Sequence, residues 1–117
     1  GSKAPRIFYV NWFRKNHDGR FLWPGFSDNS RVLKWICERI DGKVDAKKSA
    51  IGLLPVDRDL DLNGIGLPPE NIEELMKVDL DEWKAEMPDI EKHFATFGSR
   101  LPERLKKQLK ELAERLG

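Results

Sequence analysis

One short stretch, Asn11–Asn29, limits the possible folds of this chain more than any other. It holds five of the eleven aromatic residues: Trp12, Phe13, Phe21, Trp23 and Phe26. The dipeptide Asp18-Gly19 is typical of a tight hairpin turn, because both positions tolerate positive φ. Pro24-Gly25 suits a type II turn. Two turns that fold aromatic rings back on each other form either a small hydrophobic core or a slot for a flat ligand.

The composition narrows the functional classes. At 117 residues the chain is one domain at most, or a piece of a larger one. Its 21 basic and 20 acidic residues nearly cancel, so no overall field attracts nucleic acid or an anionic membrane. The single cysteine, Cys37, excludes an internal disulfide and favours a reducing compartment, here the cytoplasm. No apolar run is long enough to span a bilayer. Gly1-Ser2 resembles a cloning scar, and the abrupt start suggests that residues 3–117 are an excised segment.

The first third of the chain predicts a β-hairpin supported by a helix. Residues 6–13 are aromatic, β-branched and almost wholly apolar, which is typical of a strand covered on both faces. Residues 14–20 are a polar loop, and 21–23 are a short return strand. A hairpin alone is marginal in water, so the following helix should support it. That helix has capping residues at 28–30, ends at Gly42 and carries an apolar stripe. The stripe consists of Val32, Leu33, Trp35, Ile36 and Ile40.

The rest of the chain predicts more helix. We expect an exposed connection at 43–48, an extended segment at 49–54, a loop at 57–69 and a helix at 70–77. Asp79 and Glu82 form a capping box for a helix that reaches Phe97, and Pro88 should kink or split it. Ser99 can cap a last helix that carries a leucine stripe. The fold class is therefore α+β and mostly helical, with an aromatic β-hairpin packed with about four helices.

Most motif-like patterns in the sequence favour ordinary structural roles. Asp59, Asp61, Asn63, Gly64 and Glu70 match a calcium-loop pattern. No helix is expected to enter this loop, and the two prolines at 68–69 restrict its exit, so we favour a connector. The two histidines, at 17 and 93, lack partners at metal-ligand spacing and should be exposed. Cys37 lies on the apolar side of its helix, as a small core residue does. The sequence contains no phosphate-loop motif, and we assign no catalytic residue and no metal ligand.

The aromatic stretch leaves two interpretations open. In one, Trp12, Trp23 and Trp35 form a small core. In the other, two rings enclose a planar base, and such stacking contributes ~1–3 kcal/mol per base. Asn29 offers one acceptor and two donors, enough to read a purine edge. Residue chemistry alone does not choose between them.

Sequence blocks within this stretch and after it closely resemble the GTP-dependent phosphoenolpyruvate carboxykinases. They are Asn11–Lys15, Gly19, Phe21–Phe26 and Asn29–Leu33, followed by Asp41-Gly42, Ile51-Gly52 with Pro55, Leu60–Leu62, Trp83 and Phe97–Pro102. These enzymes interconvert oxaloacetate and phosphoenolpyruvate with loss of carbon dioxide, and use GTP as the phosphoryl donor. They are considerably longer than this chain, which resembles the C-terminal segment of their nucleotide-binding domain.

The resemblance implies that guanine is held between the rings of Phe13 and Phe26, with Phe21 and Trp12 beside it. The turn at 26–29 would contact the base, and Asn29 would read its edge. The implied guanine-binding residues are Trp12, Phe13, Phe21, Phe26, Ser27, Asp28 and Asn29. The implied ligands are GTP or GDP, with Mn or Mg bound by residues upstream of this chain. The implied partner is the remainder of the same polypeptide, in an enzyme that acts as a monomer, without membrane or nucleic acid. The isolated chain should be inactive.

Two other functions remain possible on the residues alone. The aromatic hairpin could bind single-stranded nucleic acid, with Arg14, Lys15 and Arg20 on the backbone phosphates. Alternatively, the helices could form an interaction module whose exposed apolar faces pack on a partner.

Overall fold

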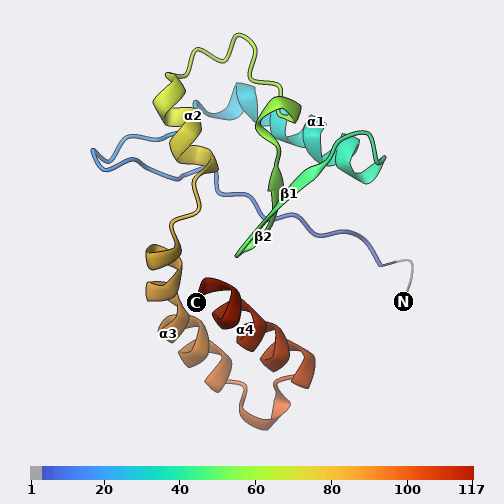
Figure 1. The fold of residues 1–117 in the computed structure, drawn as a ribbon, viewed down its shortest axis with the longest axis vertical. Coiled ribbons are helices and arrows are strands. Elements are labelled where there is room, and N and C mark those ends of the chain that lie inside the picture. Colours follow the sequence, from blue (N-terminus) through green and yellow to red (C-terminus); the bar gives the residue numbers. More distant parts are fainter. Residues whose placement is uncertain (1–3) are drawn as a thin grey trace. The chain divides into compact units, whose positions relative to one another are not determined.

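The computed structural model describes residues 4–117 and is mostly helical, as the sequence predicts. Over those residues it contains four α-helices and one two-stranded sheet, so the α+β class is confirmed (Figure 1). The chain divides into two compact units. The first comprises the described residues up to Lys47 together with Leu53–Lys77, and the second comprises Lys48–Gly52 and Val78–Gly117.

The first described residues do not form a strand. The structure assigns no regular element to residues 4–11, and Ile7 and Tyr9 are 93% and 91% exposed. The prediction of a strand covered on both faces was wrong, because a strand needs a neighbour with which its backbone pairs, and none of the described residues supplies one. Phe8 alone of this segment has a ring contact in the described part, edge-to-face with Trp35 at 6.1 Å between ring centroids.

The aromatic hairpin is present as a short ladder. Lys15 and Phe21 form one antiparallel bridge. The Leu22 amide donates to the Arg14 carbonyl, and the Asn16 amide donates to the Arg20 carbonyl, both at 2.9 Å. The predicted return strand is therefore reduced to a bridge. A turn is present at Asp18-Gly19, but only Gly19 has a positive φ, of 77°, so the tight turn with positive φ at both positions was wrong.

Two helices follow in the first unit. Helix α1 spans Asn29–Ile40 after a 3₁₀ turn at Phe26–Asp28, and α2 spans Pro69–Met76. Both helices were predicted. Trp35 of α1 is buried, but Cys37 is exposed, so its predicted core position was wrong.

The only strands of the described residues are β1, Ala46–Ser49, and β2, Gly52–Pro55, which pair in a two-stranded sheet. The prediction of an exposed connection at 43–48 missed β1. Its four residues alternate neither in polarity nor in burial, since two adjacent lysines occupy its centre. A φ of 135° at Gly52 and a 2.8 Å bond from the Ser49 hydroxyl to the Gly52 carbonyl close the turn.

The second unit is built around a helical hairpin. Helix α3 spans Leu80–Ala95 and α4 spans Glu103–Leu116, and Figure 1 shows them side by side and antiparallel. The Asp79 carboxylate accepts from the amides of Asp81 and Glu82, as a helix cap does.

Two details of this helical hairpin correct the sequence predictions. Helix α3 runs through Pro88 without a break, so of the two predicted effects, a kink or a split, the split was wrong. Ser99 lies in a 3₁₀ turn and does not cap α4, which begins after Pro102 without a side-chain cap. Among the described residues, no helix has both the length and the hydropathy needed to cross a membrane.

Candidate functional site

The aromatic residues of the 11–29 stretch and its neighbourhood separate by burial. Trp23 and Trp35 are 7% and 5% exposed, and Leu22 between the turns is 1% exposed. By contrast, Phe13, Phe21 and Phe26 are 73%, 55% and 94% exposed. The tryptophans thus contribute to the core of the first unit, whereas the three phenylalanine rings lie at its surface.

Ring contacts tie the two groups together. Trp12 is half-buried and packs on Trp23 with ring centroids 6.5 Å apart. Phe13 meets Phe21 edge-to-face at 6.2 Å, and the Lys15 ammonium lies 5.0 Å from the centroid of the Phe21 ring. Since Phe13 follows Trp12 directly, the packing of Trp12 on the buried Trp23 holds the backbone that carries the exposed Phe13 ring.

The turn that carries Phe26 has a specific backbone. Gly25 has φ 118° and ψ −157°, a region that is essentially restricted to glycine. The Asp28 amide donates to the Gly25 carbonyl at 3.1 Å, and the Ser30 hydroxyl donates to the Ser27 carbonyl at 3.3 Å. The exposed Phe26 ring is therefore mounted on an ordered turn that leads directly into α1.

Asn29, the first residue of α1, contacts the core of the unit. Its side-chain oxygen accepts a 2.8 Å hydrogen bond from the indole Nε1 of the buried Trp23. The bond joins Trp23, in the bend after Phe21, to the first residue of α1, six residues along the chain.

Arg31 fixes the other side of the same turn. Its Nε donates to Asp28 Oδ1 at 2.8 Å, and its Nη1 donates to the carbonyls of Asp61 and Asn63 at 2.9 and 2.8 Å. The Asp61 carboxylate receives Lys34 at 3.4 Å. The Asn63 amide and then Lys34 lower the pKa of Asp61. Arg31 therefore ties the 60–64 loop to the turn at 26–28.

Arg14 plays a comparable part at α2. Its guanidinium donates to the carbonyls of Leu75 and Lys77 and to the Glu74 carboxylate, at 3.3–3.4 Å. These carbonyls belong to the C-terminal end of α2, where a cation is favourable. Arg14 is thus engaged within the first unit.

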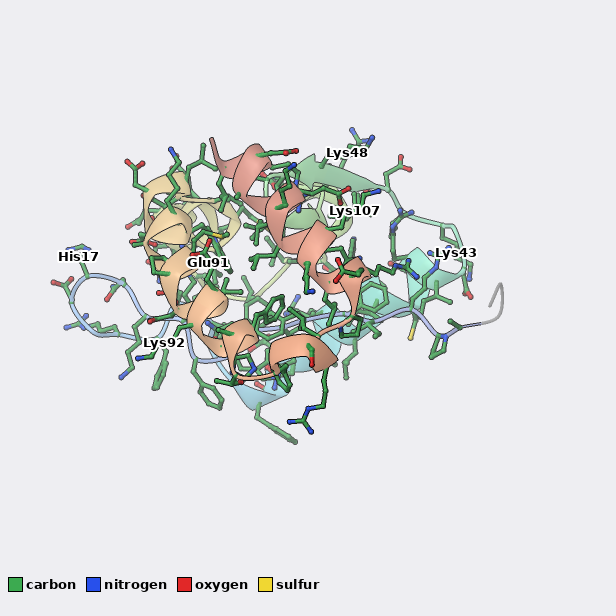
Figure 2. The ribbon with its side chains drawn as sticks, turned by 90° about the horizontal axis from the view of Figure 1, so that it is seen from below. His17, Lys43, Lys48, Glu91, Lys92 and Lys107 are labelled. Carbon is green, nitrogen blue, oxygen red and sulfur yellow. The ribbon has the colours of Figure 1, made fainter. Side chains whose placement is uncertain are left out.

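The remaining sequence candidates are not brought together. Residues 4–117 contain no group of three or more His, Cys, Asp or Glu that could hold a metal ion, the 59–70 loop included. The exposed His17 lies at the tip of its loop and points away from it in Figure 2. His93 is exposed on α3, with its ring 5.3 Å from that of Phe97.

Sequence reasoning missed the two arginines that hold this region. The spacing of three between Asp28 and Arg31 is a recognisable helix pair. The acceptors at 61, 63, 75 and 77, however, are main-chain carbonyls, which carry no sequence signal.

Comparison with known proteins identifies the family. The family model described as "Phosphoenolpyruvate carboxykinase C-terminal P-loop domain" matches residues 1–115. Proteins named phosphoenolpyruvate carboxykinase (GTP) from Arthrobacter sp. strain FB24 and Paenarthrobacter aurescens strain TC1 are 50% and 47% identical over 97% and 98% of the chain. One from Corynebacterium kroppenstedtii is 43% identical over 90% of it. The chain spans only 17–19% of the length of these relatives. The chain therefore belongs to the GTP-dependent phosphoenolpyruvate carboxykinase family, as part of its C-terminal P-loop domain.

Proposed function

We propose that this chain holds the guanine base of GTP or GDP within a longer carboxykinase that converts oxaloacetate and GTP to phosphoenolpyruvate, GDP and carbon dioxide. The chain would form the C-terminal segment of the nucleotide-binding domain of that enzyme. The observation that carries the proposal is the separation by burial: three phenylalanine rings stay exposed while the adjacent Leu22 and Trp23 are buried. Exposed rings on ordered turns supply a surface on which a flat base can stack.

The proposed base site combines two kinds of contact. The rings of Phe13 and Phe26 would enclose the base, with Phe21 and Trp12 beside them. The turn of Ser27 and Asp28 and the amide of Asn29 would contact its edge, because stacking alone does not distinguish one base from another. The seven implied guanine-binding residues all lie in one sequence stretch of the first unit.

The chain by itself should be inactive. Phosphoryl transfer depends on positioned phosphates and a divalent metal, and this sequence has no phosphate-loop motif. None of the described side chains forms a metal-binding group, so these residues do not fit the Mn or Mg that the family implies. Without phosphate contacts, free GTP should bind the isolated chain only weakly.

The structure weakens the alternative in which the aromatic hairpin binds single-stranded nucleic acid. That alternative used Arg14 as a phosphate contact, but this guanidinium is engaged at the C-terminal end of α2. The Lys15 ammonium lies 5.0 Å from the centroid of the Phe21 ring, within the proposed base site.

Replacing Phe26 with alanine in the full-length enzyme tests the proposal. Because the ring is 94% exposed in this chain, Phe26→Ala should change the free energy of unfolding of the 117-residue chain by no more than about 0.5 kcal/mol. Loss of one stacking surface should raise KM for GTP about 5- to 150-fold, the equivalent of ~1–3 kcal/mol. Tyr9→Ala is the matched control, since Tyr9 is 91% exposed and lies outside the site. Equal effects of the two variants on KM would contradict the proposal. So would a loss in the free energy of unfolding as large as the loss in the free energy of GTP binding.

A further inference from the structure

We propose that Trp23 is a positioning residue for base selection. Its indole N–H holds the oxygen of the Asn29 amide, so that the amide NH₂ group is the end left available to a bound base. The inference rests on the proposed function, in which Asn29 reads the edge of the base, and it assigns a role to a buried residue that does not itself touch the nucleotide.

The geometry allows only one orientation of the amide. The Trp23 ring is 7% exposed, and its Nε1 lies 2.8 Å from Asn29 Oδ1. An indole nitrogen can donate a hydrogen bond but cannot accept one. The amide must therefore turn its oxygen, not its nitrogen, toward Trp23, because the reverse places two donors face to face. The planar amide then directs its two N–H donors away from the indole.

This orientation distinguishes the two purines. Guanine has a carbonyl oxygen at position 6, which accepts from an NH₂ group. Adenine has an amino group there, which can only donate outward. To accept adenine, the Asn29 amide would have to turn over, break its bond with Trp23 and leave the buried indole N–H without a partner. Unsatisfied buried donors are costly, so the core of the unit opposes adenine through Asn29.

Removing the indole N–H should have unequal effects on the two nucleotides. Without the N–H, both amide orientations become accessible. GTP then loses at most about twofold, because half of the population already has the required orientation. ATP should gain about fivefold or more in kcat/KM, since turning the amide no longer forfeits the buried bond. A residue that only supported the fold would lower both values together.

The experiment uses Trp23→Phe in the full-length enzyme, with kcat/KM measured for GTP, ITP and ATP on the same preparation. The ratio between nucleotides is independent of the fraction of folded enzyme. ITP carries the same carbonyl at position 6 but lacks the 2-amino group, so it should follow GTP. Trp35→Phe is the matched control: Trp35 is also buried, at 5% exposure, and its Nε1 has no hydrogen-bond partner among the described residues.

We expect the GTP-to-ATP ratio to fall about tenfold or more in Trp23→Phe, mainly through the rise for ATP, and to stay unchanged in Trp35→Phe. If Trp23→Phe does not fold, benzothienylalanine at position 23 fills nearly the same volume without the N–H and should give the same ratio. Equal ratios in the two variants would overturn the inference. Asn29→Ala in the same series distinguishes failure of the Trp23 role from failure of the proposed function. If Asn29→Ala leaves the GTP-to-ATP ratio unchanged, Asn29 does not read the base and the proposed function fails as well. If Asn29→Ala lowers the ratio, only the role of Trp23 is lost.

Discussion

Arg31 offers the sharpest test of what orders the candidate site. We expect Arg31→Met, which keeps most of the aliphatic stem, to destabilise the first unit by about 3 kcal/mol. The guanidinium makes three hydrogen bonds of 2.8–2.9 Å, to the Asp28 carboxylate and to the carbonyls of Asp61 and Asn63. Each such bond contributes about 1 kcal/mol net. Water replaces the lost bonds only in part, because the side chains of Arg31 and Asp28 are each 21% exposed.

The assay is urea unfolding of the 117-residue chain in a Trp83→Phe background. Trp83 lies in α3 of the second unit, so the remaining fluorescence comes from the three tryptophans of the first unit. Linear extrapolation then gives the free energy of unfolding of that unit. Arg39→Met is the control on the same helix, since its guanidinium makes one 3.3 Å bond, to the Val44 carbonyl, and should cost about 1 kcal/mol or less. Equal losses in the two variants would refute the assignment of Arg31 as the residue that holds the turn.

Two further predictions concern other parts of the chain. The pKa of Asp61 lies below its ordinary value of 3.8, chiefly because the Asn63 amide donates to its carboxylate and Lys34 lies beside it. The ionised carboxylate therefore stabilises the first unit above the ordinary pKa, and this contribution disappears as the pH falls through the lowered value. Urea unfolding at stepped pH should show this acid loss, and Asp61→Asn should flatten it; an unchanged pH profile would contradict the pairing. In α3, Pro88→Ala should stabilise the second unit by about 1–3 kcal/mol, because it restores a backbone donor and removes the clash with the preceding turn. Circular dichroism should show a higher Tm for Pro88→Ala than for the unchanged chain, and no such rise for Lys92→Ala, a control at an exposed position of the same helix. A lower Tm for Pro88→Ala would show that the proline stabilises the helix.

The helices were predictable because their signals are local. The stripe from Val32 to Ile40 and the leucine spacing of the last helix repeat at the period of an α-helix, and Asp79 supplies a real cap. Strand pairing has no such local signal. Residues 6–13 have strand-like composition but no partner among the described residues, whereas the polar residues of Ala46–Ser49 pair. A strand is specified by its neighbour as much as by its own sequence.

The candidate site was predictable in its members but not in its arrangement. The aromatic spacing singled out the stretch, and the resemblance to the carboxykinases named its residues. Neither indicated that Trp23 would be buried with its N–H on Asn29, or that Arg31 would reach the carbonyls at 61 and 63. The Arg31 contacts join residues far apart in sequence through main-chain carbonyls, which look alike at every position, and the Trp23–Asn29 bond joins two side chains that the aromatic spacing does not pair. The spacing of the residues therefore predicts which rings belong to the candidate site, but not the contacts that orient them.

The guanidinium of Arg31 has one further consequence. The loop that it contacts has the residue pattern of a calcium loop, and a cation does lie against its carbonyl oxygens, but that cation is covalently attached to α1. A tethered cation is not removed by a chelator, does not exchange with the surrounding solution and does not vary with the ionic state of the cell. The loop is thereby held as constantly as the helix that carries the arginine. The same side chain also binds Asp28. The turn that carries Phe26 is therefore held by a cation that is always present, whatever the ion concentrations around the protein.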